Sequence, residues 1–123
     1  MRRALTLLGL DRAEVSVLLV GSRGMRKLNA RYRGQDKVTD VLSFPMGGGP
    51  DLPSAVLGDI VICVPRAVSQ AADYGVTAGE EIRRLLIHGL LHLLGYDHEL
   101  NAYQKKKMTA KERELIHALQ TMA

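Results

Sequence analysis

Three of the four histidines in this 123-residue sequence lie within eleven residues, His88-Gly89-Leu90-Leu91-His92-Leu93-Leu94-Gly95-Tyr96-Asp97-His98. If residues 82–94 form a helix, His88 and His92 stand at positions i and i+4, one turn apart on the same face. Gly95 follows the last expected turn, where a glycine can take positive φ and turn the chain back. We therefore expect His98 to join the other two histidines around one metal ion.

Zinc suits this ligand set, because imidazole nitrogen is one of its usual ligands and three protein ligands leave a fourth position open. An open position is typical of catalytic zinc sites, whereas structural sites have four protein ligands. Histidines that only pack in an apolar core are the alternative, but three at this spacing beside a turn glycine favour a metal. The sequence predicts one Zn²⁺ ion held by His88, His92 and His98.

The spacing H-x-x-x-H-x-x-G-x-x-H is also that of the metzincin proteases, in which a glutamate general base follows the first histidine. Gly89 occupies that position here. A glycine cannot accept a proton, so the pattern keeps the metal and lacks the base of a peptidase. The peptidase reading is disfavoured unless another acid supplies the base.

The histidine stretch is the last of three motifs that follow one another along the chain. They are LNARYRGQDKVTDVLSFP at residues 28–45, LGDI at residues 57–60 and HGLLHLLGYDH at residues 88–98. Together they resemble the YbeY family of bacterial metal-dependent endoribonucleases. The resemblance implies a zincin-like α+β fold, with a small mixed β-sheet packed with helices, in a single domain over residues 1–123.

The resemblance also implies a substrate and a reaction. It predicts a single-strand-specific, zinc-dependent endoribonuclease that acts in maturation of the 16S ribosomal RNA 3′ end and in ribosome quality control. The expected partners are single-stranded RNA, ribosomal RNA and the ribosome or its small subunit. In this reading Arg33 is catalytic, because a guanidinium can bind and neutralise a phosphate through two parallel hydrogen bonds. Asp59 and Asp97 are expected to orient metal ligands without binding the metal themselves.

The most basic part of the chain spans residues 23–37, where one acid, Asp36, stands among six cations: Arg23, Arg26, Lys27, Arg31, Arg33 and Lys37. Such a run is often a solvated helix face, and it is also what a track for RNA phosphates requires. The family resemblance favours the RNA track.

Composition limits the class of protein and the kind of partner less closely than the motifs do. A net charge of +4 permits a polyanionic partner without requiring one, and 46% apolar and 24% charged residues are typical of a globular protein. The single cysteine, Cys63, lies in an apolar run and is expected to be a buried strand residue. No apolar run approaches the length of a membrane span, so we expect no membrane association and a cytoplasmic location.

Hydrophobic periodicity, together with turn and capping residues, predicts the helices and strands in order. We expect helices over residues 2–10, 23–33, 65–74, 82–94 and 109–119, and strands over 14–20, 38–44 and 58–64, with a glycine- and proline-rich loop over 47–53. Ser22 is expected to cap the second helix, Gly75 to end the third, and Thr77 with Glu80 to form a capping box before the fourth. Family members usually carry another strand before residue 2, so the strand count is left open.

Two other classes of function compete with the nuclease. One is a metallopeptidase or another zinc hydrolase. The other is a non-catalytic ribosome-associated module whose zinc is structural and fully enclosed. The coordination sphere separates the last from an enzyme: three histidines and a solvent position indicate catalysis, whereas four protein ligands indicate structure. The sequence leaves the oligomeric state open.

Overall fold

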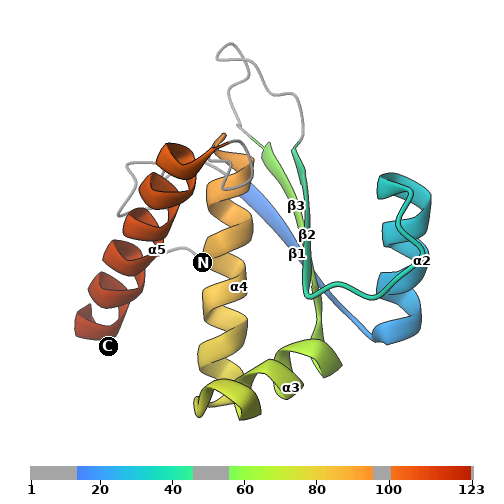
Figure 1. The fold of residues 1–123 in the computed structure, drawn as a ribbon, viewed down its shortest axis with the longest axis horizontal. Coiled ribbons are helices and arrows are strands. Elements are labelled where there is room, and N and C mark those ends of the chain that lie inside the picture. The colour runs from blue at the N-terminus through green and yellow to red at the C-terminus, as the bar shows by residue number, and fades with distance from the viewer. Residues whose placement is uncertain (1–13, 46–55, 96–100, 123) are drawn as a thin grey trace.

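The computed structural model describes residues 14–45, 56–95 and 101–122, and its strands form one mixed three-stranded sheet (Figure 1). The strands are β1 (Glu14–Val20), β2 (Val41–Pro45) and β3 (Val56–Cys63). Their spatial order is β1-β3-β2, with β1 parallel and β2 antiparallel to the central β3. The predicted α+β class with a small mixed sheet is confirmed.

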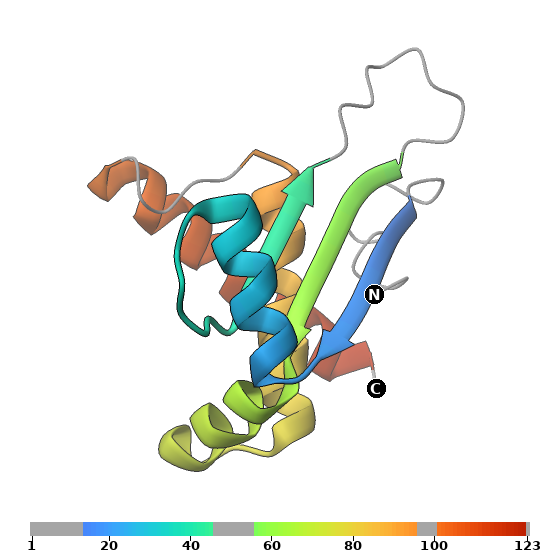
Figure 2. The same ribbon diagram turned by 90° about the vertical axis from the view of Figure 1, so that its right-hand side faces the viewer.

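Helices cover both faces of this sheet. α2 (Ser22–Arg33) packs on one face and α4 (Ala78–Leu93) on the other, while α5 (Ala102–Met122) lies outside α4 (Figure 1). α3 (Val64–Tyr74) leads from the end of β3 to the start of α4. In Figure 2, α2 stands in front of the sheet, with β2 and β1 at its two edges.

Alternate residues of β3 supply two separate cores, because successive side chains of a strand point to opposite faces. Ile60 and Ile62 pack under α4, and Val61 and Cys63 pack under α2. Cys63 is therefore a buried strand residue, as predicted. A third cluster joins α4 to α5 through four buried side chains: Ile87, Leu91, Met108 and Leu115.

The helix-end signals around α4 are confirmed. The Thr77 side chain accepts a hydrogen bond from the Glu80 amide, and the Glu80 side chain accepts one from the Thr77 amide, which completes the capping box. Gly75 ends α3 in the left-handed conformation at φ 68°. Gly95 has a positive φ of 95° directly after the last turn of α4, so the chain turns where the sequence predicted it.

Some predicted boundaries are wrong. β2 begins at residue 41, not 38, although the Asp40 carbonyl oxygen just before it still accepts a hydrogen bond from the Cys63 amide at 2.9 Å. Val64 belongs to α3, not to β3. Ser22 makes no capping bond; the N-cap of α2 is Gly21 and Ser22 is already helical.

The last helix begins at residue 102, seven residues before the predicted start at 109. The Asn101 side chain accepts a hydrogen bond from the Gln104 amide at 2.8 Å, which is the bond that an N-cap asparagine makes. The predicted helix over 2–10 and the loop over 47–53 lie outside the described residues. Within the described part of the chain, no helix combines the length and apolar character needed to span a membrane.

Candidate active site

A groove with a volume of about 890 Å³ runs along the edge strand β2, between the C-terminal end of α2 and the exposed side of α4. Elements from both faces of the sheet contribute to it, because β2 is the outermost strand on that side. Polar side chains from four segments line it: Asn29, Arg33, Lys37, Asp40, Ser43, Arg84, His88 and His92. Two predicted metal ligands and the predicted catalytic arginine therefore share one groove.

His88 and His92 face each other on successive turns of α4. Their Nε2 atoms are 3.1 Å apart, and their ring centroids are 4.7 Å apart at an angle of 70° between the planes. Two imidazole nitrogens bound to one tetrahedral zinc ion at ordinary bond lengths would be about 3.3 Å apart. The observed convergence of the two Nε2 atoms fits a shared ion.

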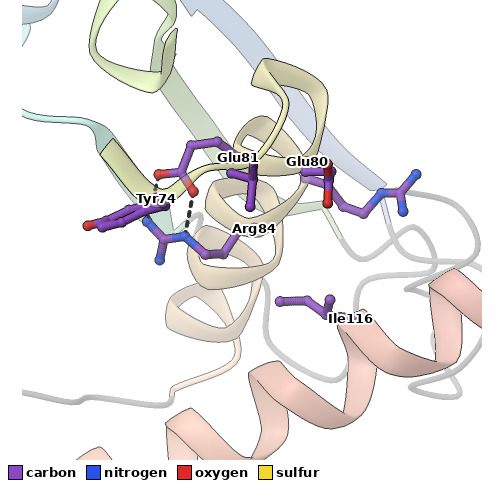
Figure 3. Close-up of a pocket in the computed structure, with 7 residues that line it drawn as sticks. Tyr74, Glu80, Glu81, Arg84 and Ile116 are labelled. Carbon is purple, nitrogen blue, oxygen red and sulfur yellow. Dashed lines mark hydrogen bonds and ion pairs between the residues drawn. The ribbon is translucent and has the colours of Figure 1, made fainter. Parts of the chain in front are cut away.

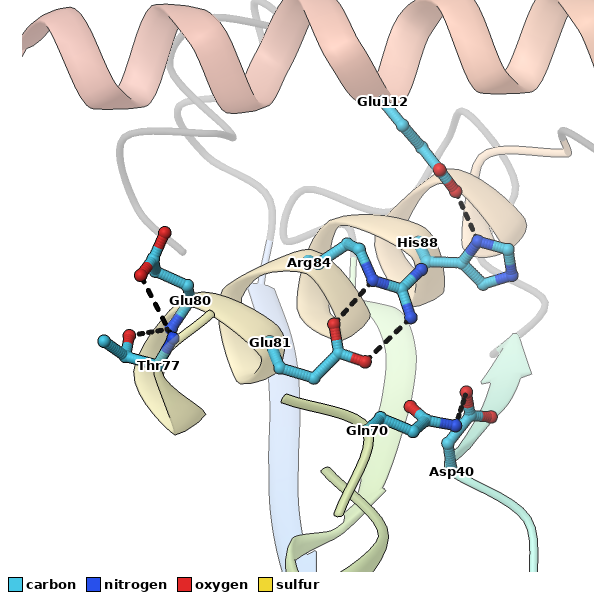
Figure 4. Close-up of polar contacts among 8 residues, drawn as sticks. All are labelled: Asp40, Gln70, Thr77, Glu80, Glu81, Arg84, His88 and Glu112. Carbon is cyan, nitrogen blue, oxygen red and sulfur yellow. Dashed lines mark hydrogen bonds and ion pairs between the residues drawn. The ribbon is translucent and has the colours of Figure 1, made fainter. Parts of the chain in front are cut away.

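Glu112 of α5 meets the opposite side of the His88 ring. Its Oε1 atom contacts His88 Nδ1, as Figure 4 shows. A carboxylate only accepts hydrogen bonds, so Nδ1–H donates and the lone pair of His88 lies on Nε2, toward His92. Glu112 was not predicted from the sequence; the available signal was a charged residue within the apolar stripe of Met108 and Leu115.

The predicted third ligand, His98, and Asp97 lie outside the described residues. Over residues 14–45, 56–95 and 101–122, no three histidine, cysteine or acidic side chains are grouped closely enough to bind a metal ion. The described site thus contains two of the three predicted ligands.

Arg33 enters the groove from the last turn of α2. Its Nη2 donates a hydrogen bond to the Ser43 carbonyl oxygen at 3.2 Å, which uses one of the five guanidinium N–H groups. The Ser43 hydroxyl in turn donates to the Gly89 carbonyl oxygen at 3.2 Å. A chain of contacts therefore connects Arg33 through β2 to the helix that carries the histidines.

Arg84 lies one turn before His88 on α4 and was not predicted. Its Nε and Nη2 atoms bind the two carboxylate oxygens of Glu81 at 2.7 and 2.9 Å, and Glu81 is only 1% exposed. Hydrogen bonding to Glu81 raises the pKa of Arg84, so this arginine remains charged at any physiological pH. Its spacing of four residues from His88 could have predicted that the two side chains share one face of the helix.

Arg84 also borders a second hollow, of about 440 Å³, whose lining residues Figure 3 shows. Tyr74 lies there, with its ring centroid 5.9 Å from the Arg84 Cζ atom. Neither His88 nor His92 lines this hollow. The bidentate pair with Glu81 therefore fixes a cation at the boundary between the two surfaces.

Gly89 faces the sheet, directly above the paired residues Ile60 and Ser43. A Cβ atom at Gly89 would lie 2.9 Å from Ile60 Cγ2 and 3.1 Å from Ser43 Oγ, closer than ordinary contact. A glutamate at this position would need still more space. The close packing of α4 on the sheet therefore leaves no space for a glutamate at the position where metzincins carry their general base.

The predicted basic track divides into two parts. Arg33 and Lys37 line the histidine groove. The other four residues border a separate shallow hollow of about 700 Å³ on the outer face of α2: Arg23, Arg26, Lys27 and Arg31. Arg26 pairs with Asp36 at 2.8 Å, and this hydrogen bond lowers the pKa of the Asp36 carboxyl.

Asp59 lies apart from the histidine groove. It pairs with Phe44 across β2 and β3, and Phe44 packs in the cluster under α2. Because directly paired residues share a face of the sheet, Asp59 points toward α2 and does not line the groove.

An α+β domain that presents a histidine pair and an arginine in one groove has side chains that can bind a metal ion and a phosphate. Known proteins share this chain's sequence and fold. The family model of "Endoribonuclease YbeY" matches residues 2–120. The chain therefore belongs to the YbeY endoribonuclease family, whose members hydrolyse RNA and depend on a metal ion.

Individual relatives agree with this assignment. The endoribonuclease YbeY of Aquifex aeolicus is 44% identical over 119 residues, covering 94% of this chain and 77% of the relative. The protein of the same name from a Sulfurihydrogenibium species is 45% identical over 106 residues, covering 86% and 70%. The solution structure of TM1509 from Thermotoga maritima superimposes with a TM-score of 0.66 at 32% identity, covering 94% of this chain and 73% of TM1509.

Proposed function

We propose that this chain is a zinc-dependent, single-strand-specific endoribonuclease that matures the 3′ end of 16S ribosomal RNA and serves ribosome quality control. It would act in the cytoplasm, on or near the small ribosomal subunit. The observation that carries the proposal is the convergence of His88 and His92 Nε2 atoms, 3.1 Å apart, in the groove that Arg33 also lines.

The proposed mechanism divides the work between the histidines and the arginine. His88, His92 and His98 would hold one Zn²⁺ ion, which would lower the pKa of a water molecule or polarise a phosphoryl oxygen. Arg33 would bind the non-bridging oxygens of the scissile phosphate and stabilise the negative charge that develops on them. Its bond to the Ser43 carbonyl oxygen restrains the guanidinium before the substrate arrives.

Two features support RNA over a peptide as the substrate. The groove contains cations suited to phosphate, Arg33, Lys37 and Arg84. The tight contact of Gly89 with Ile60 and Ser43 leaves no room for the glutamate that peptidases of this spacing use as a base.

Replacement of one ligand tests the proposal. His92→Ala should lose stoichiometric zinc and RNA cleavage together, because each histidine supplies one of three protein ligands. It should also lose the increase in melting temperature that zinc gives the wild-type protein. Zinc content by elemental analysis, cleavage of single-stranded RNA and melting temperature with and without zinc are the measurements. His117→Ala is the matched control, because His117 is exposed on α5.

A His92→Ala protein with full zinc content would overturn the metal assignment. Zinc binding that depends on His92 without any RNA cleavage by the wild-type protein would favour the non-catalytic ribosome-associated module. Cleavage of peptides but not RNA would favour the metallopeptidase.

A further inference from the structure

We propose that Glu112 is a positioning residue of the metal site, which holds the His88 ring so that Nε2 points toward the ion. This inference rests on the proposed function, because it concerns the same histidines. Glu112 comes from α5, a different helix from the one that carries His88 and His92. The metal site would then depend on the packing of two helices.

The packing of α5 fixes the place of Glu112. Met108, Glu112 and Leu115 follow the i, i+4, i+7 spacing, so all three lie on the face of α5 that meets α4. Met108 and Leu115 are 1% and 3% exposed and pack on Ile87 and Leu91 of α4. The Glu112 carboxylate is thus carried to His88 by a helix anchored on both sides of it.

The contact has the chemistry of a ligand support. A histidine that donates one ring N–H to a carboxylate is held in a single tautomer and orientation, and its other nitrogen becomes a better ligand. His88 and Glu112 are both partly shielded from water, with 21% and 16% of their side chains exposed. Solvent competes weakly for such a bond.

Other roles for Glu112 are less well supported. It is not needed as the partner of Arg84, because Glu81 already binds that guanidinium through both carboxylate oxygens. It is also not needed to attach α5 to α4, because the Met108 and Leu115 contacts do so. In the part of the chain that the structure describes, Glu112 makes its direct side-chain contact with the ring of His88 (Figure 4).

Zinc affinity, measured by competition with a chromophoric chelator, tests the inference without any activity assay. Glu112→Ala should bind zinc about 10- to 100-fold more weakly than wild type, which is the usual effect of losing such a partner. Glu112→Gln should fall between the two, because the amide keeps an acceptor oxygen and loses the charge. Glu114→Gln should match wild type, because Glu114 is exposed on the same helix and pairs only weakly, at 3.4 Å, with Lys111.

A second measurement separates positioning from stability. The Co²⁺-substituted proteins should show altered visible absorption in both Glu112 variants, whereas a purely structural role would leave the spectrum unchanged. Thermal unfolding in the presence of a chelator shows whether the metal-free fold is retained; if Glu112→Ala fails to fold, the nearly isosteric Glu112→Gln decides.

Wild-type zinc affinity and cobalt spectrum in the Glu112 variants would overturn the inference. If His92→Ala abolishes zinc binding in the same assay, only the role of Glu112 fails and the histidine site stands. If His92→Ala also binds zinc like wild type, the proposed metal site itself is wrong.

Discussion

Arg33 offers the sharpest test of the chemistry at the scale of one residue, because it lines the groove without being a metal ligand. Arg33→Ala should keep zinc and fold but cleave RNA about 100-fold more slowly or worse, as for the loss of other preorganised donors. Arg33→Lys should recover only part of the rate, since an ammonium group lacks the bidentate geometry. Cleavage rate, zinc content and melting temperature are measured together.

The control for Arg33 is Arg66→Ala, which removes an exposed arginine of α3 that lies outside the groove. Its cleavage rate should equal that of wild type. Undiminished cleavage by Arg33→Ala would remove this residue from the site, and loss of zinc in that variant would give it a structural role.

The site residues differ in how far sequence alone can predict them. His88 and His92 were predictable because a helix places residues four apart on one face, which is a local rule. Glu112 contacts His88 from 24 positions along the chain, and no spacing rule connects two helices that meet only through tertiary packing. The sequence motif around Asp59 did not reveal which face of the sheet this residue occupies, because that depends on the register of β2 and β3.

At the scale of the element, the closest approach of α4 to the sheet predicts the effect of a single methyl group. Gly89→Ala should lower the free energy of unfolding, because the new Cβ atom would lie 2.9 Å from Ile60 Cγ2. Overpacking costs about 1–3 kcal/mol. The better helix propensity of alanine returns up to about 1 kcal/mol. We expect a net loss, measured by chemical denaturation with a chelator present.

Gly79→Ala is the matched control on the same helix. A Cβ atom there would have the Thr77 hydroxyl at 3.9 Å as its nearest neighbour, so only the propensity gain remains and stability should be equal or higher. Equal stability of both variants would mean that α4 can move away from the sheet at no cost.

The elements themselves were predictable where the signal is a short-range hydrogen bond or a turn. The Thr77 and Glu80 capping box and the Gly75 turn each depend on residues close together in the sequence. The start of α5 was missed although Asn101 and Gln104 have a capping spacing, because a polar, lysine-rich first turn hides the helical period. The start of β2 was placed three residues too early, because Val38 and the apolar residues after it do not show where pairing with β3 begins.

At the scale of the whole molecule, the outer face of α2 should contribute affinity without sequence preference. Neutralising Arg23 and Lys27 together should weaken binding of all single-stranded RNAs. It should also flatten the dependence of log affinity on log salt by about 1.4, since each phosphate contact on a single strand contributes about 0.7. Binding isotherms at several salt concentrations measure this slope. An unchanged slope would make the face an ordinary solvated helix.

Two further variants control for total charge and for the ion pair. Neutralising Arg66 and Arg113, both exposed and on other helices, should leave the slope unchanged. Asp36→Asn should steepen it, because Arg26 would lose the carboxylate that binds it at 2.8 Å and become available to a phosphate.

The strand order also dictates when the sheet can form during synthesis. Both described outer strands, β1 and β2, hydrogen-bond only to β3, which is the last of the three to be made. In a nascent chain that stops before residue 56, the segments of β1 and β2 therefore have no partner strand from the described sheet. Their apolar residues stay unburied by β3 until it is made. The described pairings of β1 and β2 therefore require that residues 56–63 have left the ribosomal exit tunnel, so this sheet forms only after about half of the chain has been made.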